Sequence, residues 1–372
     1  MTVAVSDKAQ AEALGTVPQT MQAAVYRGES VVGVEQVPTP EIGPGEILIR
    51  VEACGVCHTD LKKVEYNLLP PPRVYGHETA GVVVKTGAGV TKYQPGDRVI
   101  AFHHIPCGAC FYCSHKLYAQ CPGYKKVGVT AGFEPAGGGF AQYVRVMDWI
   151  VEKGVEKIPD GISFEEASLV EPLNTCLKAV NQCDPQPNDV VVVIGQGPIG
   201  LMFTMLAAQR GARVVATDTI ERRLAVSLDC GAEISLDPTQ ADVASVLKGM
   251  TDGRGADIVL VAVSAKGIVG EAIRYSRPGA KIMLFAQTSD QERIELSGAS
   301  ICVGERSLLG SYSASVDIQR EGADLIFQKK VPVHLLISHR FPLDRIKDAF
   351  HLALHPTVES LKVVVQPQRY TE

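Results

Sequence analysis

Residues 189–200, DVVVVIGQGPIG, decide the fold of one half of the chain. The apolar run at the start is typical of a buried parallel strand. Gly195, Gly197 and Gly200 then fit the pattern G-x-G-x-x-G between a strand and a helix. In that context the first glycine makes a tight turn, the second lets the backbone approach a pyrophosphate, and the third lets helix and strand pack closely. The stretch therefore predicts a dinucleotide site at a helix N-terminus.

An acidic residue follows at the distance that such a site requires. Asp218 ends the strand-like segment RVVATD, 18 residues beyond Gly200. A carboxylate there accepts hydrogen bonds from the adenosine ribose and repels the extra phosphate of NADP, which favours NAD. Arg222 and Arg223 come next, so NADP stays open as an alternative. The predicted cofactor residues are Gly195, Gly197, Pro198, Ile199, Gly200, Asp218 and Arg223.

The pattern around this stretch divides the chain. Strand-like and helix-like segments alternate over residues 177–315, which predicts an α/β fold with a doubly wound parallel sheet. Residues 21–176 contain short apolar runs broken by proline and glycine, which indicates a β-rich domain with long loops. Residues 316–372 contain two helical patterns and the strand SLKVVVQP, and we expect them to pack on the first domain. Residues 1–20 are interpreted as a loose leader.

Composition excludes several classes of protein. The chain has 372 residues, enough for two or three domains, and 46% hydrophobic residues, enough for a sizeable core. Its net charge of -5 argues against nucleic-acid and membrane-surface partners. The first residues resemble no secretory signal, and no stretch reaches the roughly 20 apolar residues that span a bilayer. We therefore expect a cytoplasmic protein with reduced thiols.

Four cysteines cluster in CGACFYCSHKLYAQC, at positions 107, 110, 113 and 121. In a reducing compartment such spacing indicates metal ligands rather than disulfides. Cys107, Cys110, Cys113 and Cys121 can close a tetrahedron around zinc with no open position, which is typical of a structural site. The alternatives are a redox disulfide pair, a site that has the ligands but lacks the metal, and a zinc ribbon for nucleic acid. The acidic chain disfavours the ribbon. The lobe is predicted over residues 103–125, and the histidines that flank its cysteines are interpreted as surface or supporting residues.

A second set of potential ligands is dispersed in the sequence. Cys57 lies in CGVCHTDL, His77 and Glu78 lie in YGHETAG, and Glu171 lies in SLVEPLNT. A thiolate, an imidazole and one or two carboxylates are a plausible zinc set with an open fourth position. Zinc in such a site polarises a substrate oxygen and lowers the pKa of a bound alcohol or water.

Together these motifs resemble the zinc-dependent medium-chain alcohol/polyol dehydrogenases, from about residue 21 to about residue 368. The resemblance is carried by C-G-V-C-H-T-D (54–60), G-H-E-x-x-G (76–81), the cysteine lobe (107–121), G-G-F-A-x-Y (138–143), E-P-L (171–173) and G-Q-G-P-I-G (195–200). It implies a GroES-like catalytic domain over residues 21–176 and 316–372, interrupted by a Rossmann NAD-binding domain over residues 177–315. It also implies an active site in the cleft between them, and a homotetramer in preference to a homodimer.

The resemblance also assigns roles to single residues. Cys57 and His77 match the family's catalytic zinc ligands, and Asp60 matches a carboxylate that orients the histidine. Glu171 stands where simple alcohol dehydrogenases have a second cysteine, and its E-P pair resembles the sorbitol and threonine dehydrogenase branch. In that branch either Glu78 or Glu171 binds zinc directly, and the sequence leaves both open. The chain would thus hold one catalytic and one structural zinc.

The expected reaction is the reversible oxidation of a secondary alcohol with NAD. Thr59 matches a residue that takes up the substrate's hydroxyl proton. Two departures from the family bear on the substrate: Lys62 replaces a frequent histidine, and Ser313 and Ala314 replace an Arg-Tyr pair of the sorbitol branch. They put sorbitol in doubt and favour another polyol, a sugar or a cyclitol. The alternatives are a threonine-type amino alcohol dehydrogenase and a zinc-free NADPH quinone or enone reductase.

Overall fold

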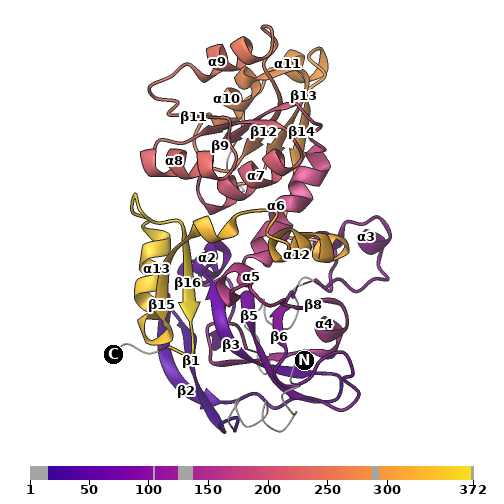
Figure 1. Ribbon diagram of the computed structural model, residues 1–372, viewed down its shortest axis with the longest axis vertical. Helices are drawn as coiled ribbons and strands as arrows, with labels where there is room; N and C mark the ends of the chain where they lie inside the picture. Colours follow the sequence, from indigo (N-terminus) through magenta and orange to yellow (C-terminus); the bar gives the residue numbers. More distant parts are fainter. Residues whose placement is uncertain (1–15, 104, 125–136, 287–292, 370–372) are drawn as a thin grey trace, which may run out of the picture. The chain divides into compact units, whose positions relative to one another are not determined.

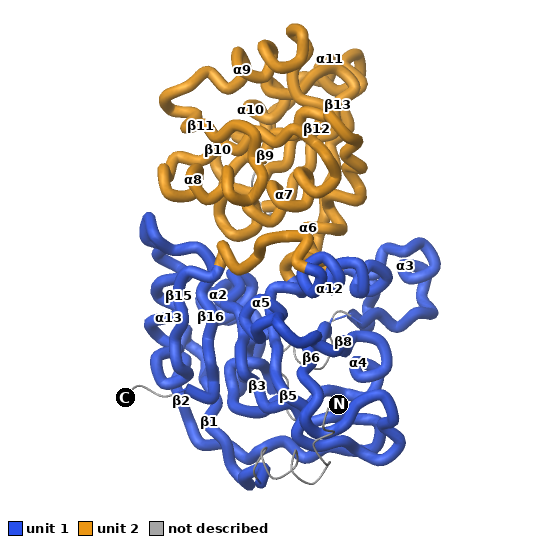
Figure 2. Tube along the Cα trace, viewed as in Figure 1, with its two compact units in different colours: residues 1–171, 315–328, 337–372 blue, residues 172–314, 329–336 orange. Residues whose placement is uncertain are grey.

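The computed structural model describes residues 16–103, 105–124, 137–286 and 293–369 (Figure 1). Most of the predicted leader, residues 1–15, lies outside these ranges. The chain forms two compact units, coloured separately in Figure 2. Unit 1 comprises residues 1–171, 315–328 and 337–372, and unit 2 comprises residues 172–314 and 329–336.

Unit 1 is built on a large, mainly antiparallel sheet with strand order β15-β16-β3-β5-β6-β8, and β7 pairs with β3. The strands are β3 (Ile47–Gly55), β5 (Glu78–Thr86), β6 (Arg98–Ala101), β7 (Tyr143–Val146), β8 (Val155–Lys157), β15 (Ile337–Pro342) and β16 (Lys362–Gln366). A smaller sheet has the order β2-β1-β4. Its strands are β1 (Thr20–Gly28), β2 (Val31–Pro38) and β4 (Arg73–Val74). The first part of the chain is therefore β-rich, as its short apolar runs predict.

Helices of unit 1 interrupt and cover these strands (Figure 1). They are α2 (His58–Glu65), α3 (Phe111–Ser114), α4 (Asp148–Lys153), α5 (Phe164–Ser168), α12 (Gln319–Phe327) and α13 (Ile346–Leu354), with 3-10 turns η1 (Tyr118–Gln120), η3 (Val316–Ile318) and η5 (Leu343–Arg345). The sequence analysis did not predict α2. Its segment HTDLKKVE has few apolar residues, and the helix forms by burying Leu61 and Val64 and by capping its N-terminus with Cys57.

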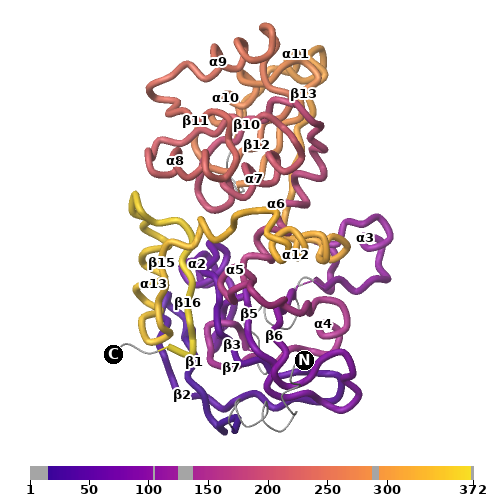
Figure 3. The backbone as a smooth tube through the Cα atoms, viewed as in Figure 1, coloured from indigo at the N-terminus to yellow at the C-terminus, as the bar shows by residue number. Residues whose placement is uncertain are grey.

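The last segment of the chain completes the main sheet. Every residue of β16 is buried, and β16 pairs with β15 on one side and with β3 on the other. Figure 3 shows this yellow segment returning to the indigo and purple N-terminal strands. Long-range pairing of this kind places residues near the end of the chain beside residues near its start.

Unit 2 is a parallel six-stranded sheet with order β11-β10-β9-β12-β13-β14. Its strands are β9 (Val190–Ile194), β10 (Arg213–Thr217), β11 (Ile234–Leu236), β12 (Ala256–Val261), β13 (Ser276–Leu284) and β14 (Ser307–Gly310). Its helices are α7 (Pro198–Gln209), α8 (Glu221–Asp229), α9 (Val243–Met250), α10 (Ile268–Tyr275) and α11 (Gly298–Cys302), with most of α6 (Val170–Cys183) and the turn η4 (Val333–Leu336). The wholly buried β9 is central, and this strand order is that of a doubly wound sheet. The predicted α/β fold class is confirmed.

Candidate metal centres and cofactor site

The four lobe cysteines converge as their spacing predicts. Their sulfur atoms all lie within 4.8 Å of one another, and none forms a disulfide. Cys110 and Cys113 sulfurs are 3.5 Å apart. The backbone N–H of Ala109, with further hydrogen bonds from Cys121 and Cys110, lowers the pKa of Cys107 to about 6. Burial raises the pKa of Cys113 to about 12. The set fits a tetrahedral thiolate site that captures zinc with release of protons.

A second group forms where α2 and β5 begin. The ligand atoms of Cys57, His77 and Glu78 lie within 4.8 Å of one another. Cys57 is the N-cap of α2, and the N–H of Thr59 donates to its sulfur at 3.4 Å. His77 immediately precedes β5, and Glu78 is its first residue. The donor set of one thiolate, one imidazole and one carboxylate fits zinc, and it leaves a position for substrate.

Asp60 holds the imidazole of His77. His77 Nδ1 lies 2.9 Å from Asp60 Oδ1, and both side chains are buried. When Nδ1–H donates to this carboxylate, Nε2 is the nitrogen that can bind a metal. Burial alone would lower the pKa of His77, but the negative charges of Asp60 and Cys57 outweigh it and raise the pKa well above its usual value. A proton therefore competes with a metal for His77.

The two glutamates that the sequence left open lie in different surroundings. Glu78 is fully buried and belongs to the cluster with Cys57 and His77. Glu171 is not in that group of the described residues. It lines a small cavity together with Thr79, Ile100, Ala101, Phe102, Ala167, Ser168 and Val170. Of the two glutamates, Glu78 is therefore the one that the structure groups with Cys57 and His77.

Lys362 is a residue of this site that the sequence analysis missed. Its Nζ lies 2.6 Å from each of the two carboxylate oxygens of Glu78. Burial lowers the pKa of Lys362, but the charges of Glu78, Cys57 and Glu171 outweigh it and raise the pKa. The signal for it was a lone lysine within the apolar strand SLKVVVQP. An apolar strand with one buried lysine requires a carboxylate partner.

His103 supports the cluster from another side. Its ring is buried and meets the His77 ring edge-on, with centroids 5.3 Å apart. Phe102 stacks on it in turn, at 6.2 Å between ring centroids. Packing of this kind restricts the orientation of His77, which Asp60 also holds.

The glycine-rich turn of unit 2 has the geometry of a pyrophosphate site. Gly195 has a φ of +90°, a conformation that side chains disfavour. A Cβ at Gly200 would overlap the carbonyl oxygen of Gly195, so helix and turn pack closely only with glycine. Gly197 is the N-cap of α7, and a Cβ there would meet nothing within 4 Å. The second glycine therefore faces open space at a helix N-terminus, where a phosphate fits. Pro198 and Ile199 form the first turn of α7.

Asp218 lies against the same turn. Its Oδ2 accepts from the N–H of Gln196 at 2.6 Å, and its Oδ1 accepts from the N–H of Ile220 at 2.9 Å. One guanidinium nitrogen of Arg223 lies 3.9 Å from Oδ2 of Asp218. Each oxygen retains a lone pair for a ribose hydroxyl. The positions of these residues fit the adenosine end of a dinucleotide.

Comparisons with known proteins agree with this geometry. The family model for the "Alcohol dehydrogenase GroES-like domain" matches residues 43–160, and that for "Zinc-binding dehydrogenase" matches residues 198–328. The chain is 29% identical to a sorbitol dehydrogenase of Bacillus subtilis, over 95% of this chain and 99% of the relative. It is 31% identical to an L-threonine 3-dehydrogenase of Symbiobacterium thermophilum, over 90% and 94%. The structure of a zinc-binding dehydrogenase from Sinorhizobium meliloti 1021, bound to NADP, superimposes with a TM-score of 0.85 at 28% identity, over 94% of this chain and 100% of the other.

The chain therefore belongs to the zinc-dependent medium-chain alcohol/polyol dehydrogenase family. It is an oxidoreductase with zinc and NAD(P) as cofactors, and its two kinds of domain are GroES-like and Rossmann-type, as the resemblance implied. Among the described residues, no helix combines the length and apolar character needed to cross a membrane.

Proposed function

We propose that this enzyme oxidises a secondary alcohol to a ketone, reversibly and with NAD, and that its substrate is a polyol, sugar or cyclitol. The observation that carries the proposal is the convergence of Cys57, His77 and Glu78 on one point, with Asp60 behind the histidine. Such a donor set is built for a metal that acts on a substrate oxygen. Family membership supports the hydride chemistry.

Residues of α2 and the metal cluster have separate roles in the proposed reaction. A bound zinc would lower the pKa of the substrate hydroxyl, and a bound NAD would accept the hydride. Thr59, half-buried beside Cys57, accepts the hydroxyl proton and passes it towards solvent. Asp60 keeps His77 in the orientation that offers Nε2. Lys62 lies one turn further along α2, at the position where the family frequently has a histidine.

Each predicted site has a place in this proposal. Cys57 and His77 hold the catalytic zinc with Glu78 or Glu171, and Cys107, Cys110, Cys113 and Cys121 hold the structural zinc. We propose that residues 177–315 form the cofactor domain and that residues 21–176 and 316–372 form the catalytic domain. Asp218 favours NAD, because a carboxylate against the turn repels a ribose phosphate. Arg223 is the residue through which NADP could still bind.

A threonine-type amino alcohol dehydrogenase is the second candidate. The Symbiobacterium relative, at 31% identity, supports it. The zinc-free reductase is disfavoured by the cluster of metal-type donors. The proposal includes a cytoplasmic homo-oligomer, with a tetramer preferred, and sedimentation of the purified protein tests the tetramer.

The decisive experiment measures NAD reduction by zinc-loaded protein across polyols, cyclitols, sugars, threonine and simple alcohols. Each reaction is repeated with a chelator and with NADP. We expect chelator-sensitive turnover on one stereochemical series of polyol, sugar or cyclitol, with NAD preferred. Turnover of threonine alone would establish the second candidate, and turnover that survives verified removal of zinc would refute the mechanism.

A further inference from the structure

Lys362 is the buried cation beside the metal cluster, and the proposed reaction gives it no task. Its side chain is 7% exposed and that of Glu78 is 1% exposed. An ammonium removed from water costs several kcal/mol unless an anion compensates it. Its nearest anion is Glu78, whose carboxylate is also a potential metal ligand. The same carboxylate thus faces two cations when a metal is bound.

The sheet register brings this pair together. Glu78 is on β5 and Lys362 is on β16, with β3 between them. Adjacent strands are about 4.8 Å apart, so the two backbones are separated by about 10 Å. Gly55 on β3 lies opposite Glu78 on one side and opposite Val364 on the other. Side chains repeat every two residues, so Lys362 is on the same face.

Gly55 leaves the space in which the two side chains meet. A Cβ at this position would overlap the carboxylate of Glu78 and would lie 2.9 Å from Cε of Lys362. Any other residue on the central strand would separate the charges. The arrangement is therefore built into three strands and does not depend on a mobile surface side chain.

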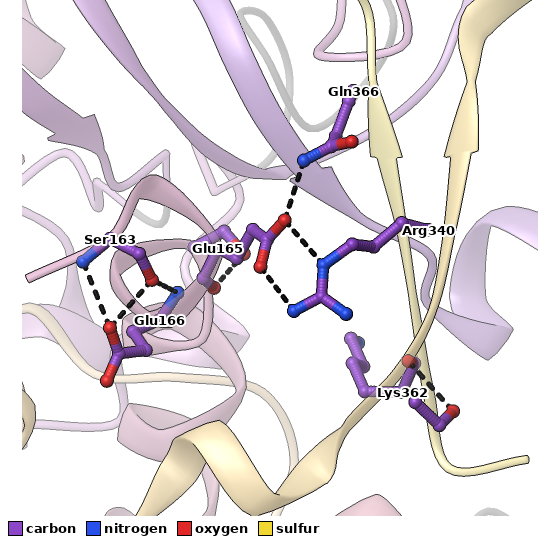
Figure 4. Close-up of polar contacts among 8 residues, drawn as sticks. Ser163, Glu165, Glu166, Arg340, Lys362 and Gln366 are labelled. Atoms are coloured by element: carbon purple, nitrogen blue, oxygen red, sulfur yellow. Dashed lines mark hydrogen bonds and ion pairs between the residues drawn. The ribbon is translucent and has the colours of Figure 1, made fainter.

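Strand β16 is fixed at both ends, which fixes the position of Lys362 (Figure 4). The hydroxyl of Ser338 donates to the carbonyl oxygen of Lys362 at 3.2 Å. At the other end, Gln366 donates to Glu165 at 2.6 Å. Arg340 of β15 donates to the same carboxylate with two nitrogens, at 2.8 and 2.7 Å. Glu165 belongs to α5, so this helix anchors both C-terminal strands.

We propose that Lys362 is a positioning residue that holds Glu78 in an ion pair and thereby weakens it as a zinc ligand. The inference rests on the proposed function, since it requires zinc at Cys57 and His77. An ammonium at 2.6 Å draws charge density from the carboxylate and competes with the metal for its oxygens. Loss of Lys362 leaves Glu78 buried without its cation, so Glu78 turns to the metal. The site then binds zinc more tightly.

A double-mutant cycle on metal affinity tests the proposal. Zinc is titrated against a chromophoric chelator in the wild type, Lys362→Met, Glu78→Gln and the double variant, with Cys57→Ala to identify the lobe zinc. We expect Lys362→Met to lower the zinc Kd about tenfold. In the Glu78→Gln background the same change should have no effect on Kd. Lys362→Arg should resemble the wild type, and so should Lys85→Met, which removes an exposed lysine from β5.

Cobalt substitution provides a readout that does not depend on activity. The visible spectrum of cobalt at the catalytic site reports its ligands, and we expect it to change in Lys362→Met and not in Lys362→Arg. If Lys362→Met does not fold, Lys362→Gln enters the same cycle. The double variant, which removes both charges together, avoids an unpaired buried charge.

Two results would overturn the inference. One is an unchanged zinc Kd in folded Lys362→Met or Lys362→Gln. The other is an equal change in Kd with and without the Glu78 carboxylate, because Lys362 would then act on the metal directly. Failure of the proposed function looks different: the wild type would bind no more zinc than Cys57→Ala.

Discussion

The two metal-type sites of this protein are built in opposite ways. The lobe takes its four cysteines from residues 107–121, on a loop with two short helical turns. The second cluster joins the N-cap of α2, the start of β5 and, through Lys362, a strand 284 residues away from Glu78. Local spacing is enough to form the first site, whereas the second exists only when the sheet is in register. We therefore expect that the lobe site can be lost with little effect on the second cluster. The predictions below test that independence.

The largest effect is expected from loss of a ligand in the second cluster. Cys57→Ala and His77→Ala should reduce turnover to background, because the zinc that acts on the substrate oxygen is lost. The lobe zinc and NAD binding in unit 2 should remain. Metal analysis, a turnover assay and a cofactor titration check this, with Cys183→Ala as a control for loss of a buried cysteine. Normal turnover by a variant with only the lobe zinc would contradict the assignment.

Loss of a lobe cysteine should affect stability more than chemistry. Cys113→Ser removes a buried thiolate from the tetrahedral set, so the lobe zinc should be lost. We expect the free energy of unfolding to fall by about 4 kcal/mol, as for other lost structural metals. Denaturant unfolding and metal analysis measure both effects. The second cluster should retain its zinc, and simultaneous loss of both metals would show that the sites depend on each other.

Asp60→Asn should weaken metal binding without removing a ligand. The asparagine cannot stabilise the imidazole as a carboxylate does, so zinc affinity of the second cluster should fall by about 10- to 100-fold. The lobe zinc in the same molecule is the internal reference, and its affinity should not change. An unchanged affinity at the second cluster would mean that His103 packing alone orients His77.

The smallest expected effect is the pH dependence of zinc binding at the second cluster. The charges of Asp60 and Cys57 raise the pKa of His77 well above its usual value and favour its protonated form, whereas zinc requires the neutral imidazole. Zinc affinity of this cluster should therefore fall as pH falls, by about tenfold per pH unit for one displaced proton. In Asp60→Asn the negative charge that raises the pKa of His77 is gone, so burial lowers that pKa. Zinc binding should then release about one proton fewer. Calorimetry in buffers of different ionisation enthalpy measures that difference, and an equal proton release would contradict it.

The parts of the molecule that sequence predicted well are local. The strand, glycines and helix of residues 189–209 are adjacent in the chain, and so are the lobe cysteines. Cys57 and His77 were predicted as ligands from their residue types and from the family resemblance. The structure brings them together with Glu78, and their metal-binding role stays a prediction. Helix α2 was missed because capping and burial of two side chains, not periodicity, stabilise it.

The partner of Lys362 could not be predicted, for a physical reason. Its contact with Glu78 depends on which strands flank β3 and on their register to a single residue. A shift of one residue would turn the lysine to the opposite face. No local pattern encodes that register. Likewise, the choice between Glu78 and Glu171 depends on where the folded protein places the start of β5 and the start of α6.

The position of β16 also bears on how the protein is made. Translation proceeds at about 5–20 residues per second, so an interval on the order of tens of seconds separates synthesis of β5 from that of β16. During that interval β3 lacks its neighbouring strand β16 beside Gly55, and Glu78 has no lysine. Under the proposed role of Lys362, zinc that arrives during synthesis meets a stronger carboxylate ligand than zinc that arrives after release. The moment of metal insertion, and the supply of zinc during synthesis, would then influence which ligands the nascent site uses first.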